Sequence, residues 1–288
     1  MKETLDEKDH SRLTSERKLA RAYLDDGRIK DAIEIFERVV AVMKETLDEK
    51  DHSRLTSERK LARAYLDDGR IKDAIEIFEH VVAVKKEILD DKDHSRLVLE
   101  HELARAYLSD RRIKDAIEIL ERVVAVMKET LDEKDHDRLA SENALASAYL
   151  DDGRIKDAIE IFERVVAVKK ETLDEEDYDR LASEHGLACA YLDDGRIKDA
   201  IEIFERVVAV MKETLDEKDH SRLTSERKLA RAYLDDGRTK DAIEILGRIV
   251  TLEGEILSHD DPRRLLSHGL LTEAYGRMQL LDETTYKA

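Results

Sequence analysis

The chain repeats itself at a fixed interval of 42 residues. Residues 1–42 recur as residues 43–84 with a single change, because His80 stands where the first copy has Arg38. Further copies begin at Lys85, Met127, Lys169 and Met211. Six copies fill residues 1–252, and residues 253–288 form a degenerate seventh copy that we expect to act as a C-terminal cap. Such tandem repetition is typical of solenoids in which each copy packs on its neighbours.

Each copy predicts two helices joined by a tight turn. Apolar residues recur at helical spacing over residues 11–24 and again over 29–47, and Asp25, Asp26 and Gly27 interrupt the pattern between them. Gly27 suits a left-handed C-terminal cap. Copy three has Arg111 at that position, and we expect its turn to persist. The interruptions argue against one continuous coiled coil, although 42 is a multiple of the heptad.

The predicted fold is therefore all-α, a right-handed α-solenoid of tandem helix-turn-helix repeats with about thirteen helices. The last helix is expected over residues 263–281. Residues 1–9 correspond to the tail of a second helix, and we expect them to fray.

Composition narrows the class of protein. The chain has 69 Asp plus Glu against 51 Lys plus Arg, a net charge of -18, which disfavours nucleic acid and anionic membranes as partners. No apolar run approaches the roughly 20 residues that cross a bilayer. The single cysteine, Cys189, excludes an intramolecular disulfide and fits a reducing compartment. We expect a cytoplasmic protein.

No motif predicts an enzyme, a metal or a cofactor. Phosphate-binding loops, C-x-x-C and nucleophile elbows are absent from the sequence. The run His101-Glu102-Leu103-Ala104-Arg105 begins like a zinc-protease motif, but Arg105 occupies the second ligand position. His185 and Cys189 are four residues apart, yet nothing supplies an oxyanion site. The histidines that recur at one position receive a loop or capping role: His10, His52, His94, His136 and His220.

The segment from Leu19 to Phe36 resembles a tetratricopeptide repeat. Small Ala20, aromatic Tyr23, the turn residue Gly27 and aromatic Phe36 fall at that motif's spacing. The 42-residue length resembles the longer variant found in kinesin light chains and in fungal NOD-like receptors of the STAND class. The near-identity of the copies resembles the receptors more. The family's usual bulky residue early in the first helix is replaced by Glu16.

Differences between the copies select one candidate face. In the first helix the copies differ at positions 11, 14, 15, 17, 18 and 21, of which 14, 17, 18 and 21 share a helical face. The resemblance implies that first helices line a concave groove and that positions 14, 17 and 21 point into it. The predicted partner-binding residues are Thr14, Arg17, Arg21, Thr56, Arg59, Arg63, Val98, His101, Arg105, Ala140, Asn143, Ser147, Ala182, His185, Cys189, Thr224, Arg227 and Arg231.

This face changes character along the chain. Copies one to three and six are basic, whereas copies four and five carry small, uncharged residues. Like charges such as Arg17 and Arg21 at i, i+4 cost about 0.2 to 0.5 kcal/mol on an isolated helix, which favours an acidic ligand. Alternatively, Glu16 and Asp25 neutralise them and the face is merely solvated. In the second helix, Glu34 and Arg38 are interpreted as an ordinary surface pair.

The resemblance implies a protein or peptide ligand in the groove, bound by the recognition region of a fungal STAND-type receptor. A cargo or scaffold adaptor of the kinesin light-chain type is the second hypothesis. An engineered repeat scaffold without a natural ligand is the third. End-to-end self-association through the terminal repeats is also expected.

Overall fold

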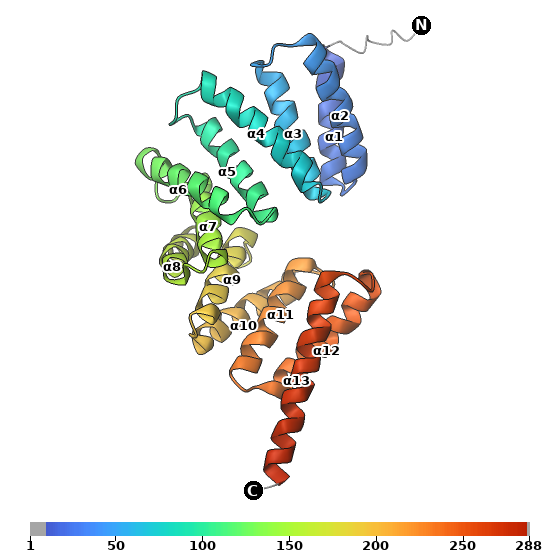
Figure 1. Ribbon diagram of the computed structural model, residues 1–288, viewed down its shortest axis with the longest axis vertical. Coiled ribbons are helices and arrows are strands. Elements are labelled where there is room, and N and C mark those ends of the chain that lie inside the picture. Colours follow the sequence, from blue (N-terminus) through green and yellow to red (C-terminus); the bar gives the residue numbers. More distant parts are fainter. Residues whose placement is uncertain (1–9, 287–288) are drawn as a thin grey trace. The chain divides into compact units, whose positions relative to one another are not determined.

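The computed structural model describes residues 10–286, and the predicted fraying of residues 1–9 lies outside them. Those residues form thirteen α-helices and no strand, so the predicted all-α fold of tandem helical repeats is confirmed (Figure 1). We call the first helix of each copy its A helix and the second its B helix. The A helices are α1 (His10–Asp25), α3 (His52–Asp67), α5 (His94–Ser109), α7 (His136–Asp151), α9 (Tyr178–Asp193) and α11 (His220–Asp235). The B helices are α2 (Ile29–Thr46), α4 (Ile71–Ile88), α6 (Ile113–Thr130), α8 (Ile155–Thr172), α10 (Ile197–Thr214) and α12 (Thr239–Ile256). The seventh copy contributes α13 (Pro262–Tyr286), five residues longer at its C-terminal end than the sequence predicts.

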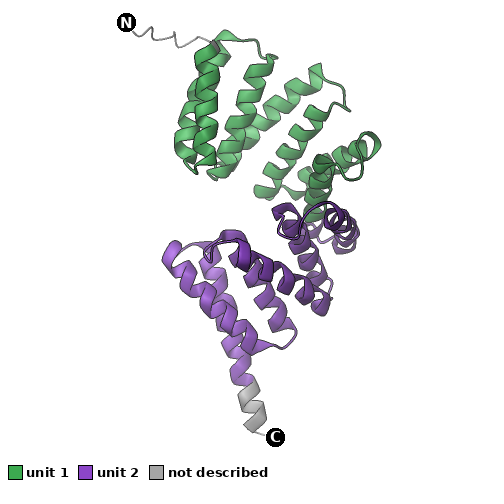
Figure 2. Cartoon of the chain, turned by 180° about the vertical axis from the view of Figure 1, so that it is seen from behind, with its two compact units in different colours: residues 1–148 green, residues 149–288 purple. Residues whose placement is uncertain are grey.

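The helices fall into two compact units that meet within α7 (Figure 2). Unit 1 contains residues 1–148 and unit 2 contains residues 149–288. Successive helices pack on one another in chain order from α1 to α6 in unit 1 and from α8 to α13 in unit 2. An A helix such as α3 therefore contacts both its own B helix and the B helix of the preceding copy.

Local sequence sets the ends of the helices. The Asp51 side chain caps α3 by accepting hydrogen bonds from the backbone N–H groups of Ser53 and Arg54, at 2.8 and 3.0 Å. His52 is the first residue of α3, so its predicted loop or capping role is wrong, since the preceding aspartate caps the helix. At the other end Gly69 has φ +78°, and the next N–H, that of Arg70, donates to the carbonyl of Tyr65.

The turn of copy three keeps this geometry without glycine. Arg111 has φ 61°, the only positive φ of a non-glycine residue in the described chain. Its N–H donates to Leu108 and that of Arg112 to Tyr107, as in the glycine-containing copies. The expectation that the turn persists is confirmed, at a cost of about 1 kcal/mol for a left-handed backbone.

Within each unit, a polar cluster joins one copy to the next on the side of the turns. The Tyr65 hydroxyl donates to Glu37 of the preceding B helix at 2.7 Å, and the Arg70 guanidinium lies 3.9 Å from the Tyr65 ring centre. Burial and this hydrogen bond raise the pKa of Tyr65 to about 12. The same cluster recurs around Tyr107, Tyr191 and Tyr233. These contacts explain why the residues that form them do not vary through the first five copies.

A buried glutamate lies between the A and B helices of each internal copy. Glu58, Glu100, Glu142, Glu184 and Glu226 are all at most 1% exposed. Arg54, one turn earlier, donates to Glu58 at 3.2 Å, and Arg222 does the same for Glu226. In copy one the B-helix residue Arg38 lies 3.4 Å from Glu16, not paired with Glu34 as the spacing within its own helix indicated. The acidic position is thus part of the core between the two helices.

Candidate partner-binding site

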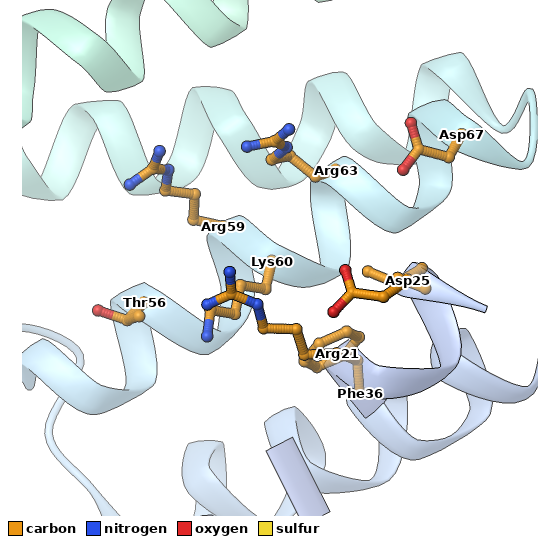
Figure 3. Close-up of a pocket in the computed structure, with 9 residues that line it drawn as sticks. Arg21, Asp25, Phe36, Thr56, Arg59, Lys60, Arg63 and Asp67 are labelled. Atoms are coloured by element: carbon orange, nitrogen blue, oxygen red, sulfur yellow. The ribbon is translucent and has the colours of Figure 1, made fainter. Parts of the chain in front are cut away.

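The variable face of the first two A helices lines a cavity of about 410 Å³ in unit 1. Arg21 comes from the C-terminal half of α1, and Arg59, Lys60 and Arg63 come from the next A helix, α3 (Figure 3). The remaining lining residues are Leu24, Asp25, Phe36, Thr56 and Asp67. The structure therefore brings together four of the predicted site residues: Arg21, Thr56, Arg59 and Arg63. Lys60 also lines the cavity. Its position varies between copies, but the family resemblance does not place it among the residues that point into the groove.

Positive charge is concentrated in this cavity. Burial lowers the pKa of Lys60, and the charges of Arg17, Arg21 and Arg59 lower it further. Among the described residues no carboxylate pairs with Lys60 or Arg21. Arg17 donates to the Ser53 carbonyl at 3.4 Å and to the Ser57 hydroxyl at 3.3 Å, both neutral acceptors. The junction between copies one and two is therefore strongly basic.

A second cavity of unit 1, about 470 Å³, follows along the same face. Here Glu102 of α5 accepts two hydrogen bonds from Arg59, at 2.6 and 2.9 Å, and these bonds raise the pKa of Arg59. Glu102 also lies 3.6 Å from Arg63. The predicted residues Val98, His101, Arg105 and Ala140 complete one side of this cavity. Its lining has three arginines and three carboxylates, those of Asp67, Glu102 and Asp137, so it carries no net charge, in contrast to the first cavity.

His101 is a neutral group at this second cavity. Its ring Nδ1 lies 3.1 Å from the Ser141 hydroxyl. Burial, and then the charge of Arg105, lower the His101 pKa to about 4, so the imidazole is uncharged at neutral pH. It therefore offers a hydrogen-bonding ring rather than a further cation beside the three arginines of the lining.

In unit 2 the same face forms a smaller, uncharged cavity of about 260 Å³. Ala182 and His185 of α9 and Thr224 of α11 were predicted site residues, and all three line it. The other lining residues are Tyr178, Met211, His220, Ser221 and Ser225. An apolar floor with a few hydroxyl groups suits an uncharged side chain.

His185 and Cys189 lie side by side without forming a reactive pair. The His185 Nε2 atom is 3.5 Å from the Cys189 sulfur, and its Nδ1 atom is 3.0 Å from the Ser225 hydroxyl. Burial raises the pKa of Cys189 to about 11 and lowers that of His185 to about 4. At neutral pH both groups are uncharged, and buried Cys189 is a packing residue rather than a surface for a partner.

The prediction for Arg227 is wrong, because its side chain is buried. Its guanidinium donates to the Glu253 carboxylate at 2.5 Å and to the Ser267 hydroxyl at 2.7 Å. Only 7% of Arg227 is exposed. Its neighbour Arg231 pairs with Asp235 at 3.1 Å and lies 3.6 Å from Glu273. Copy six has the same residues on this face as copies one and two. Its arginines instead contact residues of α12 and α13.

The other predicted residues line none of the three cavities. Thr14 is half-buried on α1. On α7, the Ser147 hydroxyl donates to the backbone carbonyl of Asn143 at 3.0 Å. Within the described residues no group of three or more potential metal-ligating side chains is found. No described helix is long and apolar enough to cross a bilayer.

The repeats also match a known sequence family. The model of the family described as tetratricopeptide repeat matches residues 11–87, 95–171 and 179–252, which is most of the chain. The chain belongs to the tetratricopeptide repeat family. Repeats of this family generally bind proteins or peptides. A comparison with curated protein sequences finds no match.

Solved tetratricopeptide repeat structures give the same result. The crystal structure described as Podosopora anserina putative kinesin light chain nearly identical TPR-like repeats is 41% identical, with a TM-score of 0.62. The match covers 73% of this chain and 99% of that one. BtubC (BKLC) from P. vanneervenii is 18% identical, covers 88% and 95% of the two chains and has a TM-score of 0.57. The apo quorum sensor NprR from B. thuringiensis is 13% identical, covers 96% and 73% and has a TM-score of 0.71. The last two support the fold alone.

Proposed function

We propose that the variable face of the A helices binds a protein or peptide, and that this array is the ligand-recognition region of a cytoplasmic fungal NOD-like receptor of the STAND class. The similar P. anserina structure also consists of nearly identical repeats, by its own description. Near-identical copies that differ at a few positions allow recognition to change while the scaffold is kept. This pattern supports a receptor.

The carrying observation is that the cavities are lined by the positions that vary. Arg59, Lys60 and Arg63 line the first cavity, and the corresponding positions of α5 line the second. The B-helix residues Lys72 and Glu76 are at least as exposed, yet their positions do not vary through the first five copies. Drift of exposed residues would have changed both helices alike. Variation at positions that line hollowed surface is what a binding face requires.

The two units favour different parts of a ligand. Unit 1 offers uncompensated cations at Arg21 and Lys60, which favour an acidic segment. Unit 2 offers the uncharged cavity around His185, which favours a small apolar side chain. The proposed ligand is thus a peptide that carries both features, or a protein surface that presents them.

Selection from a random peptide library on the folded chain tests the binding face. Selected peptides should be acidic and should lose affinity for the double variant Arg63→Glu, Arg105→Glu, whose sites are exposed and line cavities. The matched control is Lys72→Glu, Lys114→Glu, two exposed B-helix residues, which makes the same change in charge per residue and outside the cavities. Peptides that lose affinity equally for both variants would contradict the proposal.

An adaptor of the kinesin light-chain type is the second candidate, favoured by the 41% identity to the putative kinesin light chain repeats. The coding sequence upstream of this array separates the two. A nucleotide-binding domain with a phosphate-binding loop supports the receptor, whereas heptad repeats support the adaptor.

End-to-end self-association stays a prediction. Leu19 of α1 is 46% exposed, whereas the same residue of copy two, Leu61, is 4% exposed. Leu265 and Tyr275 of α13 are likewise about half exposed. Sedimentation of the chain at increasing concentration, with Leu19→Lys as the variant, tests whether these faces associate.

A further inference from the structure

One junction between copies places cations against cations. At the junction of α3 and α5, the position-18 residue of the following copy is Glu102, and it binds Arg59. At the junction of α1 and α3 the same position is Lys60, and it faces Arg17 and Arg21. The same pair of positions therefore holds opposite charges at the junction of α3 and α5 and like charges at the junction of α1 and α3.

The unbalanced charge lies in a hollow that admits a ligand. Arg21, Arg59, Lys60 and Arg63 line the 410 Å³ cavity, and Figure 3 shows Arg21 and Lys60 near one another, with Arg59 and Arg63 extending from the same helix as Lys60. Asp25 and Asp67 are the acidic residues of the lining, and Figure 3 places both toward the turn end of the helices. The lining therefore carries a net charge of +2 from four cations and two carboxylates. Neither Glu102 nor Arg17 is in the lining. Glu102 adds one negative charge beside it and Arg17 adds one positive charge, so the local net charge stays at +2.

A phosphate monoester matches this site better than a single carboxylate does. At neutral pH it carries nearly two negative charges and three acceptor oxygens. Arg21, Lys60 and Arg63 approach from two helices, so each could take a separate oxygen. Guanidinium groups bind phosphate in a bidentate manner, and Lys60 adds a point charge. A carboxylate has two oxygens and one charge, which would leave the lining cationic.

We propose that the junction of α1 and α3 binds the phosphate group of a phosphorylated side chain on the partner. This inference rests on the proposed partner-binding face and adds the chemistry of one subsite. Phosphorylation of the partner would then switch recognition on, since the unmodified hydroxyl could not balance the net positive charge of the lining.

Titration of the folded chain with inorganic phosphate, followed by NMR at constant ionic strength and neutral pH, tests the subsite. Saturable shifts are expected at Arg21, Lys60 and Arg63, with acetate at the same concentration producing weaker ones. Lys60→Glu places at this junction the residue that the next copy carries, and it should weaken phosphate binding by about tenfold or more. The matched control is Lys228→Glu, the same substitution at the same position of an identical A helix, which should leave binding unchanged.

Three results would overturn the inference: no saturable shift, equal binding of acetate and phosphate, or equal weakening by Lys60→Glu and Lys228→Glu. The first two leave the proposed function standing if unmodified library peptides still bind the A-helix face. Phosphate binding at Lys60 together with failure of every peptide, phosphorylated or not, would instead sink the proposed function.

Discussion

Helices α3 and α11 have the same sixteen residues, HSRLTSERKLARAYLD, and different surroundings. In α3, Arg59 is partly exposed at the cavities of unit 1 and pairs with Glu102 of the next A helix. In α11 the corresponding Arg227 is buried against Glu253 of its own B helix. Glu58 of α3 lies 3.6 Å from His80, whereas Glu226 of α11 pairs with Arg248. In this array, neighbouring copies decide whether a given arginine lines a cavity or is buried in an ion pair.

The difference arises at a few positions outside the identical helices. Near its C-terminal end, α12 has Glu253 where the B helices α2, α6 and α10 have Met43, Met127 and Met211. Those methionines are buried core residues, so the glutamate brings a charge into the core. Arg227 turns inward to pair with it, and the A helix loses a cation from its variable face.

The largest expected effect comes from breaking the buried pair. Arg227→Ala leaves Glu253, which is 1% exposed, without its cation and should cost about 3 to 5 kcal/mol. Arg59→Ala should cost about 1 kcal/mol or less, because that pair is partly exposed. Chemical denaturation, monitored by the helix content, measures the free energy of unfolding of both variants. The double variant Arg227→Ala, Glu253→Met should regain most of the loss, and equal costs for the two single variants would refute the contrast.

A smaller effect is expected at the buried glutamates. One oxygen of Glu58 and the Nε2 atom of His80 have no hydrogen-bond partner in the described structure. His80→Arg should give that oxygen a charged donor, as Arg122 does for Glu100, and raise stability by about 1 kcal/mol. Arg248→His, the reverse change in copy six, should lower it by a similar amount. If both substitutions left the unfolding midpoint unchanged, this part of the comparison would fail.

The smallest effect is a titration. Because burial and neighbouring arginines lower the pKa of Lys60, its ammonium group should deprotonate below 10.5, its ordinary value. NMR of the lysine side-chain carbons against pH measures the midpoint, and Arg21→Gln should raise it. Since the folded state releases this proton more readily, the Lys60 contribution to stability should rise as the pH increases from that midpoint to the ordinary value of 10.5. If the midpoint lay at 10.5 and did not change in the variant Arg21→Gln, the cavity would not be basic.

Repetition made most of the fold predictable. The interruption at Gly27 and the apolar spacing predicted the helix pairs, and the structure confirms them within one or two residues in the complete copies. The turn at Arg111 followed from its neighbours. Arg38 was assigned to Glu34 because helix spacing describes contacts within one helix only. Its contact with Glu16 depends on how two helices pack, which the one-dimensional pattern does not contain.

The candidate site was predictable only in part. Variation between copies found the face, including Lys60, but position 18 was set aside because the family pattern did not include it. The burial of Arg227 could not follow from its own helix, since α3 has the same sequence and an exposed arginine. The signal was Glu253, a charge at a position otherwise held by methionine or lysine. Comparison of copies on the B helix, extended to copy six, would have found it.

A crystal structure of the chain with a library-selected peptide tests the central claim most directly, that the variable A-helix face is the binding face. The account predicts an acidic or phosphorylated side chain about 3 Å from Arg21 or Lys60, with the rest of the peptide along the A helices of unit 1. A peptide that lies on the B helices, or that touches α11 and leaves α1 and α3 uncovered, would contradict it.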